Sequence, residues 1–324
     1  MKFIGSMFKN AMTTNRIEVK NGVVTIHNTE NDYGFITMFN ADEKNDEMTF
    51  TLSKKDCHTL SMFVSFDLTI KDNKIFVKMP KSKIVLANMT DACIPDTSLG
   101  DNTIQISVNS NDFEPGQKFV GNDQTRVQLN GVNITPTGYL ITDSKCIYIR
   151  KADTGIKNTI CVPKEAFKYI KDTNTCMTDG KRAAFVNSEG QLFYTSLMVV
   201  AMDMPQLNIN QVCAITVNKK HLLESLKMLR GYTNELQILN DNELRAKAAS
   251  ETNEFDITLD GKLVKGSKLN VKVYIDDVIK IIELEKEDQV LLSFNDRMLI
   301  YQKDDTTAAP KCQLLFSEKF KKLM

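Results

Sequence analysis

Hydrophobic and polar residues along the chain repeat one order of elements: a strand, a short helix, a strand, a tight turn and another strand. In the middle of the chain, TICV leads into PKEAFKYI, and TCMT, DGKR and AAFVN follow. An earlier copy starts with TFTL and SKKDCHTLSMFV, and a later copy starts with LNVKV and YIDDVIKII. The three predicted helices begin near Ser53, Pro163 and Tyr274, which are 110 and 111 residues apart. Such regular spacing indicates an internal repeat.

The other half of the repeating unit shows the same spacing. One strand, IQISVN, precedes SNDFEPGQKFV, and another, CAITVN, precedes KKHLLESLKMLRGY; their ISVN and ITVN segments start 109 residues apart, at 106 and 215. One period earlier, the N-terminal MKFIGSMFKNAM takes the place of this helix, with its leading strand shortened or missing. Alternating apolar runs with Asn-Gly or Asp-Asn turns follow each of these helices, which is typical of antiparallel strands.

The repeat predicts the fold class and the domain organisation. We expect an α+β chain of three tandem domains of about 110 residues, each with two helices and about eight strands. The expected domains are 1–97, 98–208 and 209–324. The alternative is that three unrelated α+β domains share this pattern by chance.

The predicted helix over 163–173 carries a row of positive charge. Pro163 suits its first position, because the missing N–H needs no partner there. Lys164, Lys168 and Lys171 share one face of such a helix. A row of this kind usually faces solvent, but it also suits a negatively charged partner.

Composition narrows the class of protein. The chain has 324 residues, with 42% hydrophobic and 25% charged residues, which suits two or three globular domains. No apolar run approaches the ~18 residues of a membrane span, and the N-terminus lacks the apolar core of a signal peptide. The seven cysteines show neither a C-x-x-C pair nor zinc-site spacing. We therefore expect a cytoplasmic protein with reduced thiols and no membrane contact.

Motifs for catalysis are missing from the sequence. The three histidines have no visible Cys or Ser partner, and there is no G-x-S-x-G, Walker A, G-x-G-x-x-G or H-E-x-x-H motif. The acidic clusters at 41–47, 283–288 and 303–305 resemble solvated loops more than metal sites. We therefore expect no enzyme activity, no cofactor and no bound metal.

Four segments, in the right order on a threefold repeat, resemble one family. YLITDSKCIYI resembles an A-T-D-G-H-R-L segment, TICVPKEAFKYI a V-P-R-K step, FYTSLMVVAMDMPQL an F-x-S-x-L…G-x-F-P-D-Y stretch, and LNVKVYIDDVIKII an F-N-x-x-Y-L-x-D-x-L segment. The family is the bacterial DNA sliding clamp, the β processivity subunit of the replicative DNA polymerase. The chain is shorter than usual, has Ser144, Lys145 and Cys146 in place of Gly-His-Arg, and ends in an extra SEKFKKLM. These departures fit a divergent copy from a phage or a mobile element.

The resemblance implies a ring. Three domains per chain imply a head-to-tail homodimer that closes six domains around duplex DNA and tethers a DNA polymerase, with a clamp loader as a further partner. Helices would line the hole without reading base sequence. The six predicted helices carry a net charge of +4, so the rest of this neutral chain carries −4. The expected DNA-facing residues are Lys9, Lys54, Lys55, Lys164, Lys168, Lys171, Lys220, Lys227 and Arg230, with a plain solvated face as the alternative for each.

The resemblance also implies two protein contact sites. The expected partner-peptide pocket consists of Thr142, Ser144, Lys145, Cys146, Ile147, Pro205, Ile209, Leu314, Leu315 and Phe316. The expected dimer interface joins Ile84 and Leu86 of one chain to Met228 and Leu229 of the other. For each of these residues, an ordinary place in a domain core or a turn is the alternative.

Two other function classes remain open on sequence grounds. One is a clamp-fold protein that binds clamp partners or inhibits a host clamp without encircling DNA. The other is an unrelated repeat enzyme with a site assembled between its domains.

Overall fold

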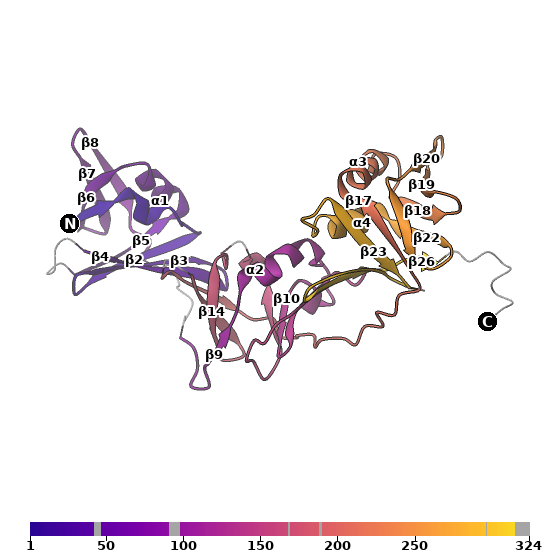
Figure 1. Ribbon diagram of the computed structural model, residues 1–324. Coiled ribbons are helices and arrows are strands. Elements are labelled where there is room, and N and C mark those ends of the chain that lie inside the picture. Colours follow the sequence, from indigo (N-terminus) through magenta and orange to yellow (C-terminus); the bar gives the residue numbers. More distant parts are fainter. Residues whose placement is uncertain (42–46, 91–97, 168, 188–189, 296, 315–324) are drawn as a thin grey trace. The chain divides into compact units, whose positions relative to one another are not determined.

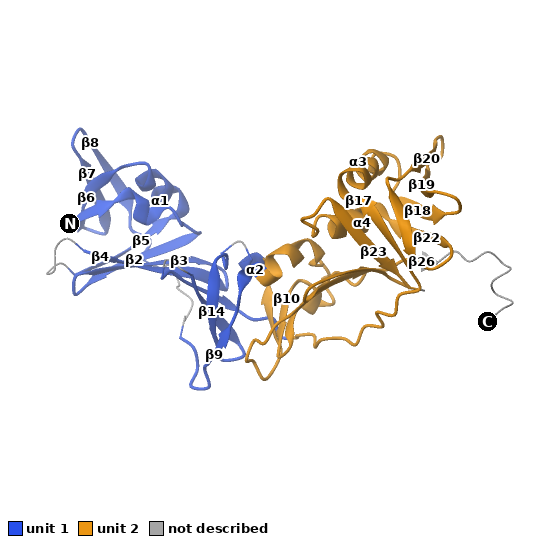
Figure 2. Cartoon of the chain, in the orientation of Figure 1, with its two compact units in different colours: residues 1–111, 165–199 blue, residues 112–164, 200–324 orange. Residues whose placement is uncertain are grey.

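The computed structural model describes residues 1–41, 47–90, 98–167, 169–187, 190–295 and 297–314 (Figure 1). The chain divides into two compact units (Figure 2): unit 1 combines Met1–Asn111 with Glu165–Val199, and unit 2 combines Asp112–Lys164 with Val200–Met324. The predicted middle domain, 98–208, therefore contributes to both units. None of the helices in the described ranges is long and apolar enough to cross a membrane.

Unit 1 contains two antiparallel sheets. The larger has the strand order β5-β2-β3-β4-β16-β15-β14-β9, and the smaller has the order β1-β6-β7-β8. The strands are β1 (Lys2–Ile4), β2 (Thr14–Lys20), β3 (Val23–Glu30), β4 (Tyr33–Asn40), β5 (Met48–Ser53), β6 (Ser65–Lys71), β7 (Lys74–Met79), β8 (Ser82–Ala87), β9 (Ile104–Ser107), β14 (Thr173–Thr178), β15 (Arg182–Asn187) and β16 (Leu192–Ser196). The pair β4–β16 makes one sheet from strands of the predicted first and second domains.

The core of unit 1 is aromatic. Phe3 is fully buried, and its ring lies 6.0 to 6.1 Å from the rings of Phe8, Phe50 and Phe66. Two helices cover this core: the 3-10 helix η1 (Gly5–Phe8) and α1 (Lys54–Ser61), which contact each other. The Ser53 hydroxyl accepts the Asp56 N–H at 3.1 Å and so caps α1.

Unit 2 contains a nine-stranded and a five-stranded antiparallel sheet, with the orders β13-β10-β11-β12-β25-β24-β23-β17-β21 and β20-β19-β18-β22-β26. The strands are β10 (Gly131–Thr135), β11 (Gly138–Thr142), β12 (Cys146–Lys151), β13 (Ile160–Pro163), β17 (Cys213–Asn218), β18 (Glu235–Asn240), β19 (Leu244–Ala249), β20 (Glu254–Thr258), β21 (Gly261–Lys265), β22 (Leu269–Tyr274), β23 (Gln289–Phe294), β24 (Leu299–Lys303), β25 (Thr306–Pro310) and β26 (Gln313–Leu314). The pair β12–β25 joins strands of the predicted second and third domains.

The remaining helices are α2 (Ser110–Phe113), α3 (Lys219–Arg230), α4 (Ile275–Ile282) and the 3-10 helices η2 (Glu114–Phe119), η3 (Val127–Leu129) and η4 (Lys164–Ala166). The helices predicted near 53, 218 and 274 are confirmed as α1, α3 and α4. α3 packs against α4, with Leu222, Leu226 and Leu229 buried. Asn218 caps α3 by accepting the His221 N–H at 3.0 Å.

Three predicted helices are wrong in extent. Among the described residues of 163–173 the one helical segment is the 3-10 turn η4, because Pro163 still pairs with Gly131 as a strand residue and Asp172 has a left-handed φ of +56° before β14. Over 2–12 the chain forms the short strand β1 and then η1. Over 110–121 the α-helical turn α2 gives way to η2, where Gly116 lies against Tyr148 so closely that a Cβ there would be 2.6 Å from its ring.

Candidate nucleic-acid surface and partner pocket

Exposed lysines gather where η1 meets α1 in unit 1. Lys9 directly follows η1, and Lys54 and Lys55 form the first turn of α1. All three side chains are exposed and line one hollow together with His58. Within the described part of the chain, none of these three lysines forms an ion pair. Their charge is therefore available to an external anion.

A second hollow adjoins the first and extends the basic surface. Lys9 lines both hollows, and the second also contains Lys171 and the amide side chains of Asn10 and Gln191. Its volume is about 440 Å³. Thus Lys9, Lys54, Lys55 and Lys171, four of the residues that the sequence predicted to face DNA, form one continuous surface of unit 1. Lys168 lies outside the described residues.

The predicted basic residues of unit 2 are more dispersed. Lys220 and Lys227 are exposed on α3, opposite its buried leucines. Arg230 forms an ion pair with Asp276 at 2.6 Å, which offsets its charge. Lys164 is half-buried and donates to the Asn122 amide oxygen at 2.8 Å.

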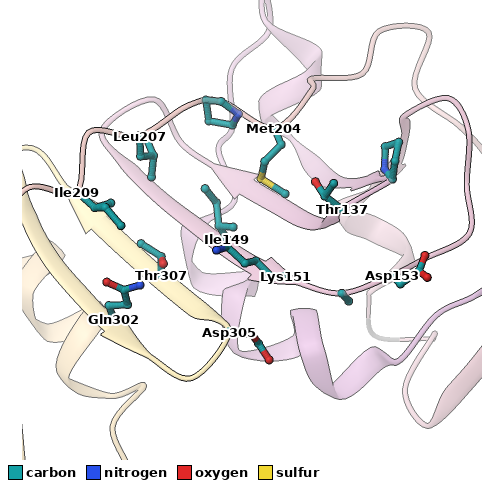
Figure 3. Close-up of a pocket in the computed structure, with 13 residues that line it drawn as sticks. Thr137, Ile149, Lys151, Asp153, Met204, Leu207, Ile209, Gln302, Asp305 and Thr307 are labelled. Atoms are coloured by element: carbon teal, nitrogen blue, oxygen red, sulfur yellow. The ribbon is translucent and has the colours of Figure 1, made fainter.

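A large pocket of about 840 Å³ lies in unit 2 (Figure 3). One wall of the pocket is the extended segment 204–209, and the opposite wall is formed by β12, β24 and β25. The lining is mainly apolar, with the charged residues Lys151, Asp153 and Asp305 at one end. The lining residues are Pro136, Thr137, Ile149, Lys151, Ala152, Asp153, Met204, Pro205, Leu207, Ile209, Gln302, Asp305 and Thr307. A pocket with apolar depth and few polar groups suits one or two anchoring side chains of a ligand.

The β11–β12 turn is fixed by the Asp143 carboxylate. Its Oδ1 accepts the N–H groups of Lys145 and Cys146 at 2.9 and 2.7 Å, and its Oδ2 lies 3.1 Å from the Lys280 ammonium on α4. Asp143, Cys146 and Asp277 bring their ligand atoms within 4.8 Å of one another. The Lys280 ammonium, 3.5 Å from Asp277, supplies this cluster with positive charge.

Each sheet has two terminal strands within the described residues, and β8 and β20 are two of them. In unit 1, β8 ends the four-stranded sheet, and its Ile84 and Leu86 are half-buried against the core. In unit 2, β20 ends the five-stranded sheet. Met228 is 51% exposed at the end of α3, whereas the side chain of Leu229 is fully buried inside the unit.

Comparisons with known proteins identify the fold. No protein-family model matches the sequence, and no curated protein sequence matches it significantly. Among solved structures, the DNA polymerase III subunit beta of Pseudomonas aeruginosa is 12% identical, with a TM-score of 0.82 over 97% of this chain and 100% of that one. A Helicobacter pylori beta clamp bound to a DNA ligase peptide is 15% identical, with a TM-score of 0.78 over 94% and 92%. A Pseudomonas aeruginosa sliding clamp bound to griselimycin is 12% identical, with a TM-score of 0.80 over 94% and 92%.

The chain has the sliding-clamp fold. At 12–15% identity the likeness establishes the fold alone. It confirms the predicted α+β architecture, and it covers nearly the whole length of a clamp subunit.

Among the predicted peptide-pocket residues whose side chains the structure describes, Pro205 and Ile209 line the observed pocket and the others do not. Ile147 lies on β12 two residues before Ile149 and so on the same face of the strand. Thr142 and Cys146 are buried, and Lys145 lines a different hollow beside α4. Leu314 lies in β26, paired with Val271, and Leu315 and Phe316 lie outside the described residues.

The sequence prediction missed Ile149, Met204 and Leu207, which line the pocket. The alternation along β12 provides a signal for Ile149, because residues two apart on a strand share a face. The segment 204–209 has no regular periodicity, so no comparable signal identifies Met204 and Leu207.

Proposed function

We propose that this protein is a DNA sliding clamp, which closes with a second copy into a ring, encircles duplex DNA and tethers a DNA polymerase. The observation that carries the proposal is the basic surface of Lys9, Lys54, Lys55 and Lys171 on a chain with the sliding-clamp fold. Lysine side chains attract phosphates without reading bases, which is what a sliding protein requires. Lys164, Lys168, Lys220, Lys227 and Arg230 complete the proposed DNA-facing set.

The ring is proposed to close through two of the terminal strands, β8 and β20. The edge of β8 in one copy meets the edge of β20 in the other, because unpaired strand edges form backbone hydrogen bonds readily. Ile84, Leu86 and Met228 supply apolar contact. The ring of Phe255, on β20, lies 4.9 Å from the ring of Tyr232, and the two rings extend this apolar patch. Leu229 supports the interface only from inside the domain, since it is fully buried.

The large pocket is proposed to take an apolar side chain of a partner peptide from a polymerase or a clamp loader. The Helicobacter pylori clamp is bound to a DNA ligase peptide, and a Pseudomonas aeruginosa clamp is bound to griselimycin. The pocket residues Pro205 and Ile209, with Ile149 and Leu207, provide the apolar depth that such an anchor needs. Ile147 extends this face, and Lys145 is available to an acidic flank. Leu315 and Phe316 remain predicted members of the partner-peptide pocket.

Retention on DNA tests the proposal. The full-length protein, with a clamp loader and ATP if it does not load by itself, is incubated with nicked circular DNA and with the same DNA after linearisation. A ring remains on the circle during gel filtration and slides off the linear molecule. Equal loss from both DNAs, together with a strict monomer by light scattering at micromolar concentration, would contradict the ring and favour a partner-binding protein that does not encircle DNA.

A further inference from the structure

Lys280 contacts the β11–β12 turn from a distant part of the chain. It lies on α4, 137 residues beyond Asp143, and its ammonium donates to Asp143 Oδ2 at 3.1 Å. The other carboxylate oxygen accepts two backbone N–H groups of the turn. One carboxylate therefore connects the backbone of the turn to α4.

This ion pair is shielded from solvent. The side chains of Asp143 and Lys280 are 19% and 26% exposed. Burial raises the pKa of Asp143, but the backbone N–H groups and Lys280 outweigh it and hold the pKa below its usual value. Burial lowers the pKa of Lys280, but Asp143, together with Cys146 and Asp277, raises it above its usual value. Both groups are therefore charged at neutral pH, and partial burial limits the screening that weakens surface pairs.

The turn needs such support because its backbone is strained. Ser144 has φ +73°, a conformation that residues other than glycine adopt infrequently. The Thr142 hydroxyl accepts the Ser144 N–H at 3.1 Å. β12 begins directly after the turn, at Cys146, and its residues 149 and 151 line the large pocket. The position of the turn thus sets where the pocket wall begins.

We propose that Lys280 is a positioning residue for the partner pocket, which it serves by holding Asp143 and, through it, the turn 143–146 and the start of β12. The inference rests on the proposed function of the pocket. A second ion pair provides a matched control. Lys118 of η2 lies 3.3 Å from Glu283, directly after α4, and within the described residues it has no ion pair or hydrogen bond to the turn.

Two measurements on the full-length protein test the inference: hydrogen exchange of the Lys145 and Cys146 amides, and the dissociation constant for griselimycin. Lys280→Met should speed exchange at these two amides and weaken griselimycin binding, each about tenfold, the factor that corresponds to 1.4 kcal/mol. Lys280→Arg should leave the exchange rate and the dissociation constant close to their wild-type values, since it keeps the charge. Lys118→Met should change both by less than about twofold. If Lys280→Met fails to fold, Asp143→Asn removes the same ion pair.

The outcomes separate the two proposals. If the wild-type protein binds griselimycin and Lys280→Met binds it with the same affinity, the positioning role alone is overturned. Equal weakening by Lys118→Met and Lys280→Met also overturns it, because the effect would then be general loss of stability. No griselimycin binding by the wild-type protein contradicts the proposed pocket itself and the positioning role with it.

Discussion

Gly34 of β4 and Tyr194 of β16 are directly opposite each other. These two strands join the predicted first and second domains in one sheet. A Cβ at Gly34 would lie 2.6 Å from the Tyr194 hydroxyl and 2.3 Å from the Asn28 carbonyl oxygen. The Tyr194 ring is 4% exposed, so it cannot move into solvent without opening the sheet. The absence of a side chain at position 34 is therefore what lets the tyrosine occupy this joint.

Gly34→Ala should lower the free energy of unfolding by about 1–3 kcal/mol, the usual cost of forcing extra volume into a packed site. Urea unfolding followed by circular dichroism measures the change. Gly231→Ala is the control, because a Cβ there would approach no closer than 3.6 Å to a neighbour. Equal stability of Gly34→Ala and Gly231→Ala would show that the joint has room to adjust.

The hydroxyl of Tyr194 should contribute little to the stability of the fold. Within the described residues this buried hydroxyl has no hydrogen-bond partner, and burial raises the pKa of Tyr194 to about 12. Because an unpaired buried polar group is unfavourable, Tyr194→Phe should leave stability unchanged or raise it by up to about 1 kcal/mol. A loss of more than that amount in urea unfolding would reveal a partner for the hydroxyl.

Glu285 should make folding dependent on pH. Its carboxylate is 5% exposed and accepts hydrogen bonds from Lys303 at 2.6 Å and Tyr301 at 3.3 Å. Burial raises the pKa of Glu285, but Lys303 and the backbone N–H groups of the next two residues lower it overall. Its stabilisation is therefore present above the unfolded-state pKa and is lost as pH falls through the lower folded-state pKa.

We expect Glu285→Gln to cost about 1–3 kcal/mol at pH 7 and less as the solution is acidified below about pH 4. Urea unfolding of the wild type and the variant, at pH 7 and again below about pH 4, measures this loss of stability. Glu287→Gln is the control, because Glu287 also contacts Lys303, at 2.7 Å, but its side chain is 73% exposed. A deficit for Glu285→Gln that is independent of pH would contradict the assigned role of its charge.

The basic surface of unit 1 should set the salt dependence of DNA binding. Replacing Lys9, Lys54 and Lys55 with glutamine should weaken binding to duplexes of any sequence. It should also reduce the slope of log K against log salt by up to about 2.7, since each phosphate contact contributes about 0.9. Folding should change by less than about 0.5 kcal/mol per exposed site. Fluorescence anisotropy at several salt concentrations measures the slope.

A control with the same charge change distinguishes contact from net charge. Lys71, Lys74 and Lys78 are exposed on the β6–β7 hairpin, and their glutamine variants also remove three positive charges. We expect this control to retain most of the wild-type slope. If both triple variants lose the slope equally, the protein attracts DNA through overall charge and not through the proposed surface.

Sequence patterns predicted those turns and helices that are determined by neighbouring residues in the sequence. The Asn21-Gly22 turn has the expected positive φ values of 53° and 77°, because this pair favours a tight hairpin between β2 and β3. The helix over 163–173 was wrong because pairing of Pro163 with Gly131 outweighs local helix preference. The Lys280–Asp143 pair was not predicted, because nothing local links residues that far apart in sequence. Lys9, Lys54, Lys55 and Lys171 were predicted as members of one DNA-facing set, and the fold adds that they line two adjoining hollows.

The partner pocket gives the last prediction. Ile147→Asn together with Ile209→Asn should abolish stimulation of a cognate DNA polymerase, because peptide anchors derive most of their affinity from apolar depth. The dimer should persist, since neither residue lies on β8, β20 or the end of α3. Ile209 is 40% exposed and Ile147 is partly exposed, so folding should be little affected. Primer extension on a singly primed circle measures stimulation, and sedimentation measures the dimer.

Met38→Asn is the matched control, because Met38 is 68% exposed on β4 and is not among the residues that line the pocket. It should leave both stimulation and the dimer unchanged. Full polymerase stimulation by the Ile147/Ile209 double variant at ordinary protein concentration would place partner binding elsewhere. Loss of the dimer along with stimulation would instead assign these residues to assembly, since a broken ring cannot hold a polymerase on DNA.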